Sequence, residues 1–298
     1  MYDKTYGLPE TMTYALMFYR SDIFADLNLD VPETWEELYE IIPTLQNSNY
    51  QIAIPIGLDG YTPVLVIYCY AGHGYGTTTS GSACAMGVFL RINVDSNEAL
   101  DAFEDFTDMF TKYKSPIVTD ITRFRTGENP IMVQNDGITA YNTLMGFYEL
   151  RGLWEMAPLL GVRQEDGSIN HTSPVTVNAL VIPRGATNPD ATWEYLKGRT
   201  CEDTQIRQNK ENLAINANPT AKLATSNKAA LLRLAWTDYE YAAIKAQVEQ
   251  LVGIPDYPGC YIVTQYVNSA FQVVYGDSSD AATEMLNRVL YINKELSR

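Results

Sequence analysis

Apolar residues in this chain fall into short runs separated by stretches with helical spacing. The run at residues 15–19, Ala-Leu-Met-Phe-Tyr, predicts a buried strand, and residues 51–56 predict a second one. Shorter strands are expected at residues 131–133, at 138–140 around Gly137, and at 179–182. The runs are therefore spread along the chain, with helical patterns between them.

Helix starts are marked by capping residues. Thr34 and Glu37 form a capping-box pattern ahead of apolar residues at helical spacing. A second helix is expected from about residue 96, because Ala99, Phe103 and Phe110 share one face. Further starts are predicted at these caps: Asn188 before Pro189, Thr237 with Glu240, and Asp280. Strands alternate with helices early and helices dominate late, which indicates an α/β fold.

Charge narrows the choice of partners. The 298 residues contain 36 Asp plus Glu against 21 Lys plus Arg, for a formal net charge of -15. This charge argues against binding to nucleic acid or to an anionic membrane. No run approaches the roughly 20 apolar residues of a membrane span. Met1-Tyr2-Asp3-Lys4 lacks the features of an export signal, so we expect a cytoplasmic chain or a mature or excised piece.

Motifs for metal, nucleotide or nucleophilic chemistry are missing from the sequence. Two histidines and four cysteines, without CxxC or HExxH, offer no metal motif, and we expect no metal and no cofactor. The sequence does not decide whether Cys69 and Cys84 form a disulfide, because four cysteines allow three full pairings. Free thiols are the simpler interpretation. The glycine-rich residues 72–76 match no phosphate-binding pattern, and no GxSxG elbow occurs. We therefore expect no catalytic residue.

Tyrosine is the most unusual feature of the composition. The chain has 21 Tyr, against 9 Phe and 4 Trp. A tyrosine offers a flat apolar face and a hydroxyl, which suits half-polar ligands such as sugars. Many of these tyrosines must still belong to the core.

Three sequence segments near the N-terminus resemble a known family when taken in order. They are YGLPET (residues 6–11), LMFYRSDIF (16–24) and VPETWEEL (31–38). This combination is similar to the family 1 extracellular solute-binding proteins, the sugar-capturing components of bacterial ABC importers, which include maltose-binding protein. The resemblance continues through residues 128–161, 191–205 and 254–298, and so covers nearly the whole chain. One departure is Gln265, where relatives commonly carry arginine.

The resemblance implies a periplasmic-binding-protein type II-like architecture of two α/β lobes joined by crossing strands. It places residues 11–161 with 238–298 in the second lobe, and 1–10 with 172–237 in the crossing segment and the returning part of the first lobe. Residues 162–171 would form another crossing. One lobe would then be complete and the other partial, as expected of a fragment or a truncated gene product.

The implied function is reversible capture of a carbohydrate, expected to be an oligosaccharide, between the lobes. The implied partners are the transmembrane subunits of an ABC permease, and the implied location is extracytoplasmic, as a periplasmic protein or a cell-surface lipoprotein. By motif, the expected ligand-binding residues are Glu10, Thr11, Asp59, Tyr61, Tyr141, Tyr257 and Tyr261. Trp35 and Trp193 are expected to pack, whereas Trp154 and Trp236 are open to ligand contact.

Two alternatives compete with this interpretation. One is a glycosidase or lyase, which needs two carboxyl groups roughly 5 to 10 Å apart in an aromatic cleft. The other is a truncated interaction module that takes no part in transport.

Overall fold

The computed structural model describes residues 5–54, 97–117, 120–164, 166–215, 221–253 and 260–296. The strands are β1 (Leu8–Tyr14), β2 (Leu16–Tyr19), β3 (Ile52–Ala53), β4 (Ile131–Gln134), β5 (Glu155–Ala157), β6 (Val162–Arg163), β7 (Ile169–Asn170), β8 (Ser173–Leu180) and β9 (Leu251–Gly253). The helices are α1 (Ser21–Leu27), α2 (Trp35–Asn47), α4 (Asn97–Thr111), α5 (Ile121–Arg125), α6 (Gly137–Met145), the 3-10 helix η1 (Tyr148–Leu150), α7 (Pro189–Thr200), α8 (Glu202–Ile215), α9 (Lys228–Leu232), α10 (Asp238–Glu249), α11 (Cys260–Asp277) and α12 (Ala281–Leu296).

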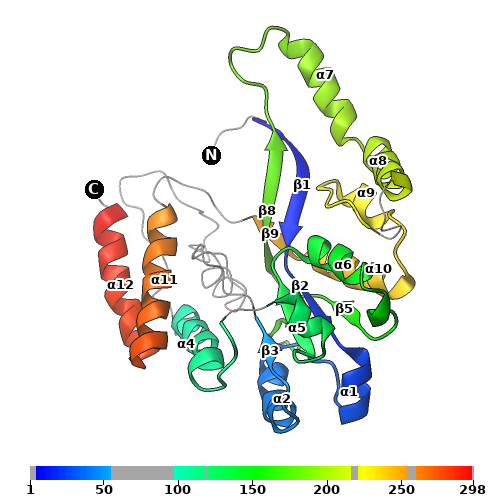
Figure 1. The fold of residues 1–298 in the computed structure, drawn as a ribbon. Coiled ribbons are helices and arrows are strands. Elements are labelled where there is room, and N and C mark those ends of the chain that lie inside the picture. Colours follow the sequence, from blue (N-terminus) through cyan, green and yellow to red (C-terminus); the bar gives the residue numbers. More distant parts are fainter. Residues whose placement is uncertain are drawn as a thin grey trace.

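A four-stranded sheet in the order β3-β4-β2-β5 forms the centre of the lower part of the molecule (Figure 1). All four residues of β2 are buried, and they alternate between two hydrophobic clusters. Met17 and Tyr19 belong to the cluster with α2, α4, α11 and α12, whereas Leu16 and Phe18 face the cluster with α6 and α10. Because successive side chains of a strand point to opposite faces, a continuous apolar run is what a strand covered on both faces requires.

The predicted helix caps are confirmed. Thr34 and Glu37 form a reciprocal capping box at the start of α2, as do Thr237 and Glu240 at the start of α10. The Asn188 side chain accepts a hydrogen bond from the N–H of Ala191 ahead of α7. These caps satisfy backbone donors that would otherwise lack partners in the first helical turn.

The strand predicted at residues 138–140 is wrong, because these residues lie in helix α6. Asp136 caps this helix through the N–H and the hydroxyl of Thr139. Ile138, Tyr141 and Leu144 are buried on one face at helical spacing. The prediction that Tyr141 follows a strand is therefore also wrong, because this residue lies in the middle of a helix.

Two other strand predictions needed new boundaries. The strand predicted at residues 179–182 is β8, which begins at Ser173 and ends at Leu180. The described part of the strand predicted at 51–56 is limited to Ile52–Ala53. The strand at 131–133 and the helix from about residue 96 are confirmed as β4 and α4.

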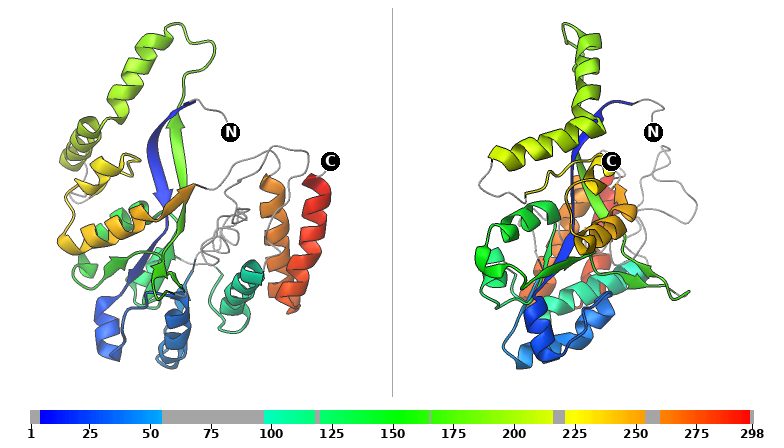
Figure 2. Two further views of the ribbon diagram at one scale, coloured as in Figure 1. Left: turned by 180° about the vertical axis from the view of Figure 1, so that it is seen from behind. Right: turned by 90° about the vertical axis from the view of Figure 1, so that its right-hand side faces the viewer.

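Strands β1 and β8 form an antiparallel ribbon that rises from the four-stranded sheet, and β9 pairs with the lower end of β8. Helices α7, α8 and α9 lie along one side of this ribbon, while α4, α11 and α12 pack together on the other side of the molecule (Figures 1 and 2). The ribbon thus links the lower part of the molecule to the helices at its upper end.

The buried side chain of Gln247 fixes the chain where it enters β8. Its carbonyl oxygen accepts a hydrogen bond from the N–H of Leu159 at 2.6 Å, and its amide donates to the carbonyl of His171 at 3.1 Å. The His171 ring nitrogen Nδ1 lies 2.6 Å from the carbonyl oxygen of Leu159. The backbone N–H of His171 donates a hydrogen bond to the Gln250 side chain. Two chain segments and the end of α10 are therefore held together by one polar network.

Replacing Gln247 by leucine should lower the free energy of unfolding by about 2 to 4 kcal/mol, because one buried and one partly buried backbone group would lose their partners. Urea denaturation measures this loss. The control Gln272→Leu changes an exposed position of α11 and should stay within about 0.5 kcal/mol of the parent. Equal effects of the two substitutions would contradict the role assigned to Gln247.

Substituting Gly137 by alanine should also destabilise the fold. A Cβ at this position would lie 2.6 Å from the Leu16 side chain, so the contact between α6 and β2 would be overpacked. We expect a loss of about 1 to 3 kcal/mol in urea denaturation. Gly198 in α7 has open space around the corresponding position, and Gly198→Ala should be neutral or slightly stabilising. A Gly137→Ala protein as stable as Gly198→Ala would contradict this packing argument.

Candidate functional site

The lower half of the β1–β8 ribbon, next to the four-stranded sheet, has one apolar and one polar face. Met12 and Tyr14 of β1 are buried in the cluster that includes α6 and α10. Thr11 pairs with Asn178, and Thr13 pairs with Thr176, so these four side chains share the opposite face. We call them the ribbon polar face. The Asn178 amide donates a hydrogen bond to the Thr11 hydroxyl at 3.1 Å, which fixes both groups.

The ribbon polar face is uncharged and open. Thr176 and Asn178 are exposed, and Thr11 and Thr13 are half-buried. Hydroxyl and carboxamide groups can each donate and accept hydrogen bonds. The arrangement therefore suits a neutral ligand that carries many hydroxyl groups.

Glu10, a predicted ligand residue, is already engaged by the protein. The pairing of β1 with β8 shifts between Pro9 and Thr11, which leaves Glu10 as an extra residue in a bulge. Its Oε1 accepts a hydrogen bond from Nε of Arg199 at 2.8 Å and lies 2.7 Å from Nη2 of the same guanidinium. The side chain thus ties β1 to α7, and its contact with ligand stays a prediction.

Tyr141 lies in a buried aromatic cluster. Its side chain is 1% exposed, and its ring packs edge-on against Trp154 and Trp236 at centroid distances of 5.9 and 5.3 Å. Its hydroxyl donates to Glu240 at 2.9 Å, and burial followed by the Glu240 charge and this hydrogen bond raises the pKa of Tyr141. Tyr141 therefore holds α6 against α10, and its predicted ligand contact is untested.

Lys222 completes this cluster. Its ammonium group lies 5.1 Å from the centre of the Trp236 ring and 5.7 Å from that of Tyr141. Burial lowers the pKa of Lys222, and the nearby Glu240 charge opposes this effect. Contacts of this kind between a cation and aromatic rings add to the packing energy of the rings themselves.

Of the remaining predicted ligand residues, Tyr261 lies within the described part of the chain. Tyr261 lies in the first turn of α11 and is 60% exposed. Asp59, Tyr61 and Tyr257 lie outside the described residues, as do Cys69 and Cys84. Cys201 is an exposed free thiol.

The ribbon polar face also contains residues that were not predicted from the sequence. Thr13, Thr176 and Asn178 lie in segments where polar residues alternate with apolar ones, and this period-two pattern could have indicated a strand with one polar face. Arg199 could not have been found this way, since it lies 189 residues from Glu10 in the sequence.

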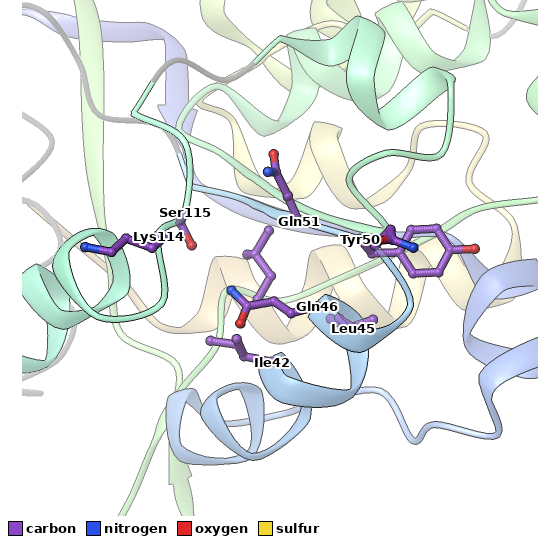
Figure 3. Close-up of a pocket in the computed structure, with 9 residues that line it drawn as sticks. Ile42, Leu45, Gln46, Tyr50, Gln51, Lys114 and Ser115 are labelled. Atoms are coloured by element: carbon purple, nitrogen blue, oxygen red, sulfur yellow. The ribbon is translucent and has the colours of Figure 1, made fainter.

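A hollow of about 280 Å³ lies at the lower end of the molecule, between the end of α2, the start of β3 and the turn after α4. Figure 3 shows that its labelled polar side chains diverge. Lys114 points away from Gln46, and the Tyr50 ring points in the opposite direction. Because these groups do not converge on one point, we assign no ligand to this hollow.

The described residues form neither a metal-binding cluster nor a membrane-spanning helix. Among them, no group of three or more His, Cys, Asp or Glu side chains is placed to hold a metal ion. No described helix is long and apolar enough to cross a membrane.

Solved structures of similar fold come from several bacteria. An ABC transporter solute-binding protein from Thermotoga lettingae, bound with α-D-tagatose, has a TM-score of 0.71 at 19% identity, over 99% of this chain and 74% of its own. A substrate-binding protein from Listeria monocytogenes in complex with cycloalternan has a TM-score of 0.70 at 17% identity, over 99% and 73%. The sugar-binding protein MalE from Xanthomonas citri has a TM-score of 0.73 at 17% identity, over 99% and 72%. The predicted α/β periplasmic-binding-protein fold is thus confirmed.

No curated protein matches the chain. Residues 1–197 match the model of a protein family described as bacterial extracellular solute-binding protein. This match supports a binding function rather than an enzymatic one, as the sequence predicts. It covers about two thirds of the 298 residues, and the chain therefore belongs to the bacterial extracellular solute-binding proteins.

Proposed function

We propose that this protein is the substrate-binding component of an ABC importer and captures a carbohydrate, of oligosaccharide type, outside the cytoplasmic membrane. The observation that carries the proposal is the ribbon polar face, in which hydroxyl and carboxamide groups line a ribbon that links two parts of the molecule. Its chemistry matches sugar hydroxyls. The descriptions of the similar structures named above also give sugars as the bound ligands.

We propose the following lobe boundaries. Residues 11–161 with 238–298 form one lobe, and residues 1–10 with 172–237 form the crossing segment and the returning part of the other. Residues 162–171 lie between them. Support comes from the four-stranded sheet, which is covered by helices on both faces, and from the separate position of α7 and α8 at the far end of the ribbon.

In this proposal the ribbon acts as the hinge between the lobes. Hinge closure around a ligand absorbs backbone changes in a few residues while the packed units stay rigid. The closed form is then recognised by the transmembrane subunits of the permease. The ribbon polar face contacts the ligand in the closed form because it lies where the two lobes meet.

Aromatic residues are proposed to stack on the apolar faces of the sugar rings. Tyr61, Tyr257 and the exposed Tyr261 take this role, and Asp59 accepts hydrogen bonds from sugar hydroxyls. Glu10 and Tyr141 take supporting positions, because Arg199 and Glu240 already occupy their polar groups.

The ribbon polar face can be tested with Thr176→Val and Asn178→Ala. Both residues are exposed, so the melting temperature should change little. Isothermal titration calorimetry with D-tagatose, maltose, maltotetraose and cycloalternan measures affinity. For any sugar that binds the parent protein, we expect each substitution to weaken binding about tenfold through the loss of a hydrogen-bonding group.

Thr44→Val is the matched control, because Thr44 is an exposed threonine of α2 outside the ribbon. It should leave the affinity unchanged. If Thr176→Val binds as tightly as Thr44→Val, the ligand does not use the ribbon polar face. If the parent protein binds none of these sugars, the proposed ligand class is wrong.

A further inference from the structure

A pocket of about 380 Å³ lies on the flank of the lower part of the molecule, where the end of α6, residues 151–156 and the start of α10 meet. We call it the flank pocket. Met145, Met156 and Trp154 contribute its apolar lining, and Arg151, Glu155 and Tyr239 contribute polar groups. A volume in this range is typical of small-ligand sites.

The flank pocket is separate from the ribbon polar face. Glu155 pairs with Tyr19, the last residue of β2. Tyr19 lies six residues beyond Thr13, which corresponds to roughly 20 Å at about 3.3 Å per residue of extended chain. One ligand ring cannot contact both places, so the flank pocket needs an explanation of its own.

Two donor groups in the flank pocket have no hydrogen-bond or ion-pair partner among the described residues. Within the described part of the chain the Trp154 indole N–H donates no hydrogen bond, and its ring packs against Phe18 and Tyr141 at centroid distances of 5.8 and 5.9 Å. The Arg151 guanidinium lies 4.4 Å from the centre of the Tyr148 ring and forms no ion pair with any residue that the structure describes. Glu155 accepts a hydrogen bond from Tyr19 with Oε2 and also interacts with the Tyr239 side chain. Two donor groups are thus available to a ligand.

The aromatic and acidic groups around these atoms are already fixed by the protein. The Tyr239 hydroxyl is 2.7 Å from that of Tyr19. Glu240 accepts from the Thr237 N–H at 2.8 Å and from the Tyr141 hydroxyl at 2.9 Å. Because these side chains are held in place before any ligand arrives, binding does not have to order them.

Charge and shape select the class of ligand. The lining contains one guanidinium and two carboxylates, so an anion is disfavoured, and the Arg151 guanidinium disfavours a cation. A neutral ligand that accepts hydrogen bonds and also has an apolar face fits both the two donor groups and the Trp154 ring. We propose that the flank pocket is a second binding site, which takes a single neutral sugar ring independently of the ribbon polar face.

The Trp154 indole N–H signal in a ¹⁵N-labelled sample provides a direct test, and Trp154→Phe identifies this signal by its loss. The probes are D-glucose, D-galactose, D-mannose and L-arabinose, each titrated to about 50 mM, above the millimolar range of weak binding. We expect at least one sugar to shift the Trp154 signal in a saturable manner. The Trp193 signal, from the distant helix α7, should stay in place.

Two substitutions decide whether the shift comes from the flank pocket. Arg151→Gln and Glu155→Gln each remove one charged group from the lining of the flank pocket, and each should weaken the saturable effect about tenfold. Asn178→Ala, on the ribbon polar face, should leave it unchanged, so failure of the proposed transport function would not imply failure here. The inference is overturned if no sugar moves the Trp154 signal. It is also overturned if the shift persists at equal affinity in Arg151→Gln and Glu155→Gln.

Discussion

The orientation of the ribbon depends on the buried amide of Gln247. Its two hydrogen bonds hold Leu159 and His171, so they fix where β8 begins. A shift of one residue in the pairing of β8 would turn every side chain of the strand to the opposite face. Thr176 and Asn178 would then point toward the core, and Val177 would replace them. A single uncharged side chain thus determines the chemistry that the ribbon presents.

The ribbon polar face is neutral although the chain as a whole carries a formal charge of -15. The nearest carboxylate on β1 belongs to Glu10, and the Arg199 guanidinium offsets its charge on the side of α7. Hydroxyl and carboxamide groups are also cheaper to remove from water than charged ones. A ligand that covers this face therefore loses less binding energy to desolvation than it would on an acidic surface.

Local signals in the sequence predicted local structure well, but they did not predict contacts between distant segments. The caps at Thr34 and Thr237 depend on residues three positions away, so the sequence reveals them. The three residues 138–140 are too few to distinguish a strand from a helix, and the Asp136 cap was the signal that was missed. The open groups of the ribbon and the flank pocket arise from pairings between distant segments, which no local pattern contains.

The abundance of tyrosine illustrates why composition alone cannot locate a site. Tyr19 and Tyr141 direct their hydroxyls to Glu155 and Glu240, so they join elements of the fold and offer little to a ligand. Trp154 packs against Phe18 and Tyr141, but its indole N–H has no partner among the described residues. A polar group without a protein partner, on a side chain that is already held in place, can bond to a ligand at little entropic cost. A paired polar group must first lose its protein partner. The hydrogen-bonding state of an aromatic side chain is thus a better guide to ligand contact than its type or its number.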